Sequence, residues 1–274
     1  MTKKYYIFFL LTSLLLPCAH AQEKKHNFAV ALETAAYSYK EPKMSHSMRL
    51  DGQMYGVFAE YLRRGLGNNG KSFFSADILY MTGSVDYDGW LYYRNTGTYS
   101  KHYTYDITDW FAQTNVKFGA DLGGGPVVFA PYIGLGLRYL MDESGEKGNG
   151  GYDRTSTYFY MPLGMNIKTK LGNGWALAGG GEFDWFLFGK QTSALSQLGL
   201  NDLTNQQSEG YGAKVSLRVQ KSLKKTALFF EPFFRYWHIQ ESDESYLYDG
   251  SNVYIMVEPQ NETLEWGLKA GIYF

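Results

Sequence analysis

The last eleven residues of the chain, LEWGLKAGIYF, alternate between apolar side chains and polar or small ones. Leu264 and every second residue up to Phe274 are apolar, whereas Glu265 and Lys269 stand among the residues between them. Successive side chains of a β-strand point to opposite faces of the sheet. The pattern therefore predicts a strand with one apolar face and one polar face, and the chain ends on an aromatic residue of the apolar face.

Nine further segments upstream show the same alternation. Each is long enough for a tilted strand that crosses a bilayer, which takes about 9–11 residues. The connections between them alternate between short, turn-rich segments and longer ones, as in an up-and-down meander. The ten predicted strands cover approximately residues 27–39, 48–63, 72–85, 110–120, 127–140, 156–170, 174–188, 210–220, 226–239 and 264–274. The long connections are predicted at about 40–47, 86–105, 141–155, 189–209 and 240–261.

Composition excludes several classes of protein. After the N-terminal region the chain has no run of about 20 apolar residues, so it is not a helical membrane protein. Its formal net charge of −1 gives no reason to expect a nucleic acid partner. A secreted β-sandwich would have strands of about 5–6 residues with polar outer faces. Here one face of each segment carries a row of apolar side chains, and the 24 Tyr and 31 Gly suit strands that are apolar on one face only.

The N-terminus predicts a secretory signal peptide. Lys3 and Lys4 precede the apolar run YYIFFLLTSLLLP, and Ala19 and Ala21 are the small residues that precede a cleavage site after Ala21. We therefore expect a signal peptide over residues 1–21 and a single barrel domain over 22–274. A lipoprotein is an alternative because Cys18 follows the apolar run, but Pro17 is a poor residue before a lipidated cysteine. Removal of Cys18 leaves no cysteine for disulfide or thiol chemistry.

The alternating closing strand with its terminal Phe274 resembles the C-terminal strand of bacterial outer-membrane β-barrels. In that class the terminal residues belong to the assembly signal, which the resemblance places on Trp266, Leu268, Ile272 and Phe274. The implied fold is an all-β, transmembrane, antiparallel up-and-down barrel of ten strands in the outer membrane. The resemblance also implies extracellular long loops and periplasmic termini. The expected partners are outer-membrane lipid, lipopolysaccharide and the barrel-assembly machinery.

The opposite, lumen-facing side of the predicted strands carries charges of both signs. Neighbouring strands bring opposite charges that can pair across the sheet, and unpaired charges in a confined lumen would be costly. Bulky aromatic residues on the same side predict a lumen that is mostly plugged; a narrow channel for small solutes is an alternative. The predicted charge network comprises Glu33, Glu182, Asp184, Lys214, Arg218, Glu231, Arg235, Glu265 and Lys269, and the inward aromatics are Phe58, Tyr132, Tyr158, Tyr160, Phe186, Phe188, Phe229 and Phe233.

One motif after the third predicted strand carries a second resemblance. Asp86-Tyr87-Asp88 is similar in placement to the Asp-x-Asp of the omptins, ten-stranded outer-membrane aspartyl proteases. That family also needs an Asp-x-His at the end of the seventh strand, where this chain reads FLFGKQ. His238 is the alternative base. The strand alternation points His238 outward, and it points Asp86 and Asp88 outward unless a bulge near Gly83 shifts the register.

The second long connection is rich in aromatic residues. Exposed aromatics among polar residues suit adhesion to carbohydrate or protein, although some of them fit an aromatic girdle equally well. The acidic clusters in other loops lack the spacing of a calcium loop, so we expect no cofactor and no bound metal. The leading hypothesis is a non-enzymatic barrel that either binds a partner through its loops or serves as a structural component of the envelope. The predicted loop binding surface comprises Trp90, Tyr92, Tyr93, Tyr99 and Tyr103. The alternatives are the narrow channel and the omptin-like protease.

Overall fold

The computed structural model describes residues 26–43, 45–67, 70–93, 96–123, 125–148, 150–250 and 252–274. The expected signal peptide, with Cys18, lies outside the described residues. No helix within the described ranges has the length and hydrophobicity needed to cross a membrane.

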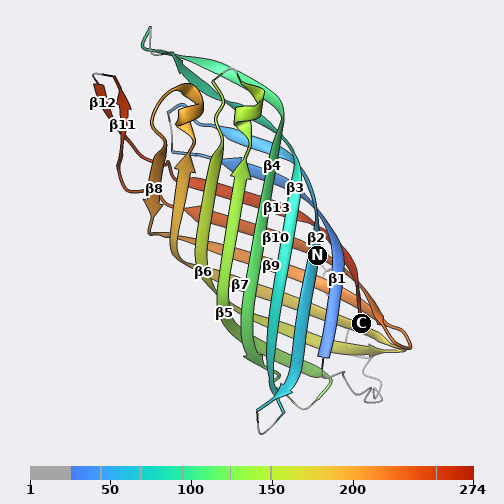
Figure 1. Ribbon diagram of the computed structural model, residues 1–274. Helices are drawn as coiled ribbons and strands as arrows, with labels where there is room; N and C mark the ends of the chain where they lie inside the picture. The colour runs from blue at the N-terminus through green and yellow to red at the C-terminus, as the bar shows by residue number, and fades with distance from the viewer. Residues whose placement is uncertain are drawn as a thin grey trace, which may run out of the picture.

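Ten antiparallel strands form a closed ring (Figure 1). Each strand pairs with the next along the chain, and the last strand pairs with the first over twelve residue positions from Ala29↔Tyr273 to Lys40↔Glu262. The predicted ten-stranded up-and-down barrel is therefore confirmed. The ring consists of β1 (His26–Lys40), β2 (Arg49–Leu66), β3 (Ser72–Tyr93), β4 (Thr98–Ala120), β5 (Val127–Asp142), β6 (Arg154–Gly172), β7 (Trp175–Ser193), β9 (Gly210–Ser222), β10 (Ala227–Ile239) and β13 (Asn261–Tyr273).

The two ends of the barrel differ in their connections. The links after β2, β4, β6 and β9 are short turns, and they define what we call the turn end. The links after β1, β3, β5, β7 and β10 define the long-loop end. That end also carries two 3-10 turns, η1 (Ser144–Lys147) and η2 (Leu195–Leu198), the strand β8 (Leu203–Gln207) beside β7, and a hairpin of β11 (Ser245–Asp249) and β12 (Asn252–Met256).

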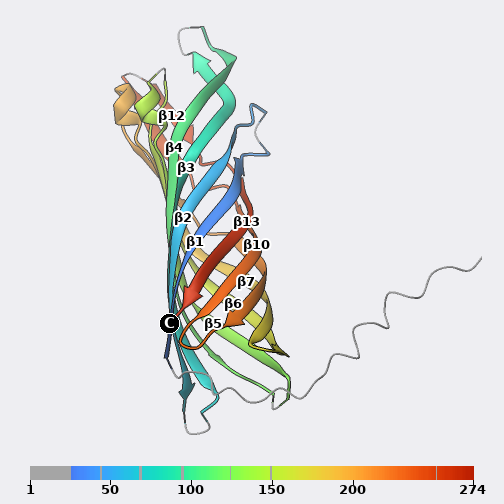
Figure 2. The ribbon, with the colours of Figure 1, turned by 90° about the vertical axis from the view of Figure 1, so that its right-hand side faces the viewer.

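One predicted loop is largely a hairpin. The prediction of a loop over 86–105 is wrong, because β3 and β4 stay paired up to Tyr93↔Thr98 and project beyond the rest of the barrel (Figure 2). The register shifts between Val85 and Tyr87, where Asp106 adopts a left-handed backbone with φ of 56°. Above this bulge Tyr87 still packs against the buried core cluster, but most side chains of β4 are exposed. The outer face no longer has to be apolar there, so the alternation that marks the lower strands fades.

The predicted faces of the strands are present in the wall. Outward apolar side chains are strongly exposed, for example Leu32 at 71% and Trp266 at 63%, whereas inward ones such as Met81 are buried. The predicted orientation of Phe188 is wrong. We expected it in the lumen, but it is 55% exposed and stacks on Phe159 with ring centroids 4.6 Å apart. A bulge in β7 at Leu187, which has no partner between Phe159↔Phe188 and Tyr160↔Phe186, shifts the pairing with β6, and the alternation breaks there.

Small residues allow the barrel wall to close at β13. A Cβ atom built on Gly267 would lie 2.0 Å from the backbone oxygen of Thr34 in β1. Real Cβ atoms do not approach an oxygen so closely, so this position requires glycine. The last residue also contributes to closure, because the amide of Phe274 donates a hydrogen bond of 2.8 Å to the carbonyl of Phe28.

Candidate functional site

A buried ion pair spans the lumen. Arg138 of β5 is completely buried, and its guanidinium donates hydrogen bonds to Glu265 of β13 at 2.7 Å and to Gln113 at 3.1 Å. The guanidinium carbon also lies 4.0 Å from the ring centroid of Phe111. In the ten-membered ring, β5 and β13 are five strands apart in either direction. The pair therefore joins diametrically opposite walls.

A second set of ion pairs surrounds this bridge. Arg235 forms an ion pair with Glu33, and its other amino group lies 3.4 Å from Glu265. Lys269 lies 3.1 Å from Glu33 and 3.7 Å from Glu231. The strand register sets Glu33 and Glu231 opposite Lys269, and Arg235 opposite Glu265. The charges thus alternate in sign around this part of the lumen.

The remaining predicted charges lie along β7 and β9. Glu182 is opposite Lys214 in the register, but its closest cation is Lys117 of β4, at 2.7 Å. Arg218 forms an ion pair with Glu231 and donates to the hydroxyl of Tyr273. Asp184 is 2% exposed, and its Oδ1 has no hydrogen-bond partner among the described residues.

Aromatic rings occupy the lumen above the ion pairs. Tyr160 is fully buried, and its ring meets that of Trp237 edge-on with centroids 4.9 Å apart. Its hydroxyl donates a hydrogen bond of 2.6 Å to Asn115 on β4. Tyr158 and Phe186 pack beside it in the same buried cluster. Rings and ion pairs from facing strands therefore meet inside the barrel.

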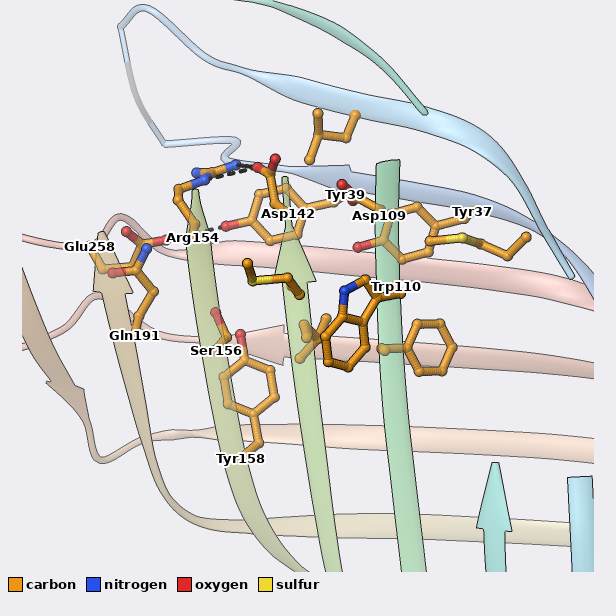
Figure 3. Close-up of a pocket in the computed structure, with 15 residues that line it drawn as sticks. Tyr37, Tyr39, Asp109, Trp110, Asp142, Arg154, Ser156, Tyr158, Gln191 and Glu258 are labelled. Atoms are coloured by element: carbon orange, nitrogen blue, oxygen red, sulfur yellow. Dashed lines mark hydrogen bonds and ion pairs between the residues drawn. The ribbon is translucent and has the colours of Figure 1, made fainter. Parts of the chain in front are cut away.

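A small cavity lined by both apolar and charged residues lies at the long-loop end of the lumen (Figure 3). It encloses about 30 Å³, which is room for roughly two water molecules. Its lining includes the charged residues Asp109, Asp142, Arg154 and Glu258 together with Tyr39. Asp109 is 4% exposed, and its Oδ1 accepts no hydrogen bond from any described residue.

Arg154 is the cation at the centre of these carboxylates. Its guanidinium donates to Asp142 at 2.8 and 3.1 Å and to Glu41 at 3.2 Å. The hydroxyl of Tyr39 lies 3.3 Å from a carboxyl oxygen of Glu41 and 3.3 Å from one of Glu258. Because Arg154 opens β6 and Glu41 follows β1, these contacts also connect opposite sides of the barrel.

Burial controls the ionisation of the two glutamates outside the strands. Loss of water and the nearby charge of Glu41 raise the pKa of Glu258 to about 8. Burial also raises the pKa of Glu41, although Arg154 opposes the increase. Carboxyl groups with a raised pKa in a cavity are typical of functional sites, and structural networks produce them as well.

The candidate catalytic residues do not come together. The register is regular at Gly83, and Asp86 is exposed, with its carboxylate accepting a hydrogen bond of 3.2 Å from the amide of Asp106. Asp88 forms an ion pair with Lys101. His238 lies four strands away on β10, 3.6 Å from Glu262 and in ring contact with Tyr211. No described contact joins His238 to either aspartate.

The projecting hairpin gathers aromatic residues at the long-loop end. The ammonium of Lys101 lies 5.4 Å from the ring centroid of Trp90 and 5.2 Å from that of Tyr103. Tyr99 stacks on His46, from the turn after β1, with centroids 3.9 Å apart. The side chains of Tyr92 and Tyr93, which we also predicted here, lie outside the described residues. Exposed side chains of this surface are Tyr99 (51%), Tyr103 (53%) and Tyr105 (65%), and the β11–β12 hairpin exposes Tyr246, Tyr248, Val253 and Ile255.

Sequence reasoning missed the residues that connect opposite walls. The strand alternation places Arg138 and Lys117 on the inward face, but the predicted charge network does not include them, because it pairs charges only between neighbouring strands. In a ring of ten, strands five apart face each other, and this rule would have suggested Arg138 and Glu265 as partners. Glu41 and Glu258 carried no such signal, since both lie outside the regular strands.

No protein-family model and no curated protein sequence matches the chain. Among solved structures, the chain is similar to the outer membrane protease OmpT from Escherichia coli, with a TM-score of 0.60 and 11% identity over 91% of this chain and 96% of that one. It also matches the Pseudomonas putida toluene transporter TodX, with a TM-score of 0.35 and 9% identity over 92% and 89% of the two chains. The outer membrane phospholipase A of Escherichia coli gives a TM-score of 0.24 and 10% identity over 90% and 96%.

The ring of ten strands and the likeness to OmpT together define the class of the protein. It has the antiparallel up-and-down fold of bacterial outer-membrane β-barrels, as the sequence predicts. Within that class its architecture is the one seen in OmpT. At 11% identity this likeness concerns the fold, and the activity of OmpT does not transfer with it.

Proposed function

We propose that the protein is a non-enzymatic outer-membrane barrel that binds extracellular carbohydrate or protein through its projecting hairpins. In this proposal the long-loop end faces the outside of the cell, both termini face the periplasm, and lipopolysaccharide surrounds the upper wall. The observation that carries it is the row of exposed tyrosines on β4, at positions 99, 103 and 105.

The geometry of β4 supports a binding role. Side chains two residues apart on a strand lie on one face about 6.8 Å from each other, so Tyr99, Lys101, Tyr103 and Tyr105 form one row. Tyrosine offers a large, rigid and amphipathic contact area at low entropic cost, which is why it is common in binding surfaces. Lys101 lies over two rings of this surface, and its ion pair with Asp88 adds polar groups beside them.

The filled lumen supports the choice of the hairpins over the barrel interior. Arg138 and Glu265 connect opposite walls at 2.7 Å, and Lys117 and Glu182 connect β4 with β7. A solute that crossed the lumen would have to break these buried ion pairs. We therefore assign recognition to the surface outside the wall.

The test is binding by the protein in lipid nanodiscs to panels of glycans and of purified extracellular proteins. The variants Tyr103→Ser and Tyr105→Ser should each reduce affinity about tenfold or more, as loss of an aromatic hot spot does. Leu223→Ser is the matched control, because Leu223 is 50% exposed at the opposite, turn end. Equal affinity of both tyrosine variants and the control for every ligand would contradict the proposal.

Two alternatives predict different results. A narrow channel predicts steady, ion-selective openings in planar bilayers, whereas the plugged lumen predicts none. An omptin-like protease predicts cleavage of a peptide library and its loss in Asp86→Ala. Against this second alternative, Asp86 is exposed and accepts a hydrogen bond from the amide of Asp106, whereas His238 contacts Glu262 and Tyr211.

A further inference from the structure

Two buried glutamates, one near each end of the sequence, meet at the long-loop end of the lumen. Glu41 follows β1, and its amide donates a hydrogen bond of 3.1 Å to the carbonyl of Met48 at the base of the turn. Glu258 precedes β13. Its amide donates a hydrogen bond of 2.8 Å to the hydroxyl of Ser242, and its carbonyl accepts one of 3.0 Å from the amide of Ser242. Their side chains are 6% and 8% exposed, and both reach the hydroxyl of Tyr39.

This contact has too few hydrogen-bond donors unless one of the two carboxyl groups is protonated. A tyrosine hydroxyl carries one hydrogen, so Tyr39 can donate to one carboxylate only. Arg154 already donates to Glu41, and no cation among the described residues donates a hydrogen bond to the carboxyl group of Glu258. If Glu258 is protonated, its own hydroxyl donates to the oxygen of Tyr39, while Tyr39 donates to Glu41. The three groups then form a complete chain of hydrogen bonds.

The surrounding charges favour the protonated form. One cation, Arg154 on β6, faces the carboxyl groups of Glu41, Glu258 and Asp142, the last from β5. Asp109 on β4 interacts with Asp142 and Arg154, and adds a fourth carboxyl group. The other titratable groups that face the glutamates are neutral phenols, namely Tyr39, Tyr87, Tyr152 and Tyr158. Four carboxylates around one guanidinium would repel each other strongly in this buried position.

We propose that a proton held between Glu258, Tyr39 and Glu41 keeps the mouth of the lumen closed, and that its loss separates the connection before β13 from the turn after β1. The open form would expose the cavity above Asp109 and Arg154 to the outside. This pH-sensitive closure is independent of ligand binding by the hairpins.

The direction of the pH effect follows from proton linkage. The pKa of Glu258 is raised to about 8 in the closed form, whereas an exposed glutamate has the ordinary value of 4.5. Between these values the closed form binds one more proton than the open form. The ratio of open to closed molecules should then rise tenfold per pH unit, and the rise should level off above pH 8.

Distances between spin labels would measure this separation directly. The chain has no cysteine after Cys18, so Lys43→Cys in the turn after β1 and Met256→Cys at the end of β12, next to the connection before β13, introduce two unique sites. The doubly labelled protein in nanodiscs should show one short distance at pH 5, with a longer population that grows up to pH 8. Glu258→Gln keeps a neutral donor at this position, and it should hold the short distance at every pH.

Three comparisons decide the outcome. Glu41→Gln removes one of the two facing charges and should also retain the short distance at pH 8, which gives a second variant should Glu258→Gln misfold. Glu146→Gln is the matched control, because Glu146 is exposed in η1 outside the cavity, and it should follow the parent. An unchanged distance in the parent from pH 5 to pH 9, or a pH-dependent increase that persists in Glu258→Gln, would overturn the proposal.

Discussion

Removal of Arg138 should destabilise the barrel more than removal of any exposed cation. In Arg138→Met, Glu265 loses its 2.7 Å partner in a fully buried position and retains only Arg235, at 3.4 Å. Removal of one partner of a buried ion pair costs about 3–5 kcal/mol, because the other charge stays in a medium of low dielectric constant. The remaining Arg235 offsets part of this cost. We therefore expect a loss of about 2–4 kcal/mol in the free energy of unfolding.

The measurement is urea unfolding of the protein in lipid vesicles, followed by tryptophan fluorescence. Lys40→Met is the matched control, because Lys40 lies 2.9 Å from Glu262 but its side chain is 49% exposed. Exposed pairs contribute about 0–1 kcal/mol, so this variant should unfold almost as the parent does. Adding Glu265→Leu to Arg138→Met removes the stranded charge and should restore at least half of the loss. A single variant within about 1 kcal/mol of the parent, or a double variant less stable than the single one, would refute the reasoning.

Three further changes test other parts of the structure. Deletion of Phe274, which we expect to belong to the assembly signal, should reduce the amount of protein in the outer membrane while the folded barrel keeps nearly its full resistance to urea; wild-type levels after fractionation would contradict this. Gly267→Ala places a Cβ 2.0 Å from the backbone oxygen of Thr34, so it should prevent formation of the heat-resistant folded band on gels, whereas normal folding would show that the wall adjusts. Since the pKa of Glu258 is raised on folding, its contribution to stability is complete below pH 4.5 and falls until about pH 8, by at most about 1.4 kcal/mol per pH unit, and Glu258→Gln should flatten the urea midpoint over that range.

The alternation of side chains predicts the barrel because the membrane imposes it. A strand between lipid and a polar lumen needs one apolar face, and this requirement shows in residues such as Leu268 and Lys269 of β13. The requirement ends where the wall ends. The β3–β4 hairpin projects beyond it, so the sequence offers no comparable signal and we expected a loop there. A single bulge in β7 likewise places Phe188 on the outer face and not in the lumen, because each added residue reverses every side chain after it in the same strand.

The site was less predictable than the fold. Sequence indicates which charges point inward, but the contacts between opposite walls depend on the width of the ring and on its closure. Glu41 and Glu258 are 217 positions apart and lie outside the strands, and only the folded chain brings both of them to Tyr39. The motif that contains Asp86 is the opposite case. Its sequence matches a known pattern, but the fold does not bring it together with the residues that it would need for catalysis.

The bridge between β5 and β13 has a consequence for how the barrel is made. Arg138 is synthesised well before Glu265, so its guanidinium has no carboxylate to meet across the lumen until the final strand is in place. A ring that closed with β13 shifted by one residue would turn Glu265 toward lipid and leave Arg138 as a bare charge inside. The correctly aligned ring is the one in which both charges are neutralised. The bridge would thus favour the correct register, since barrels with a shifted β13 would remain unstable enough to reopen and pair again.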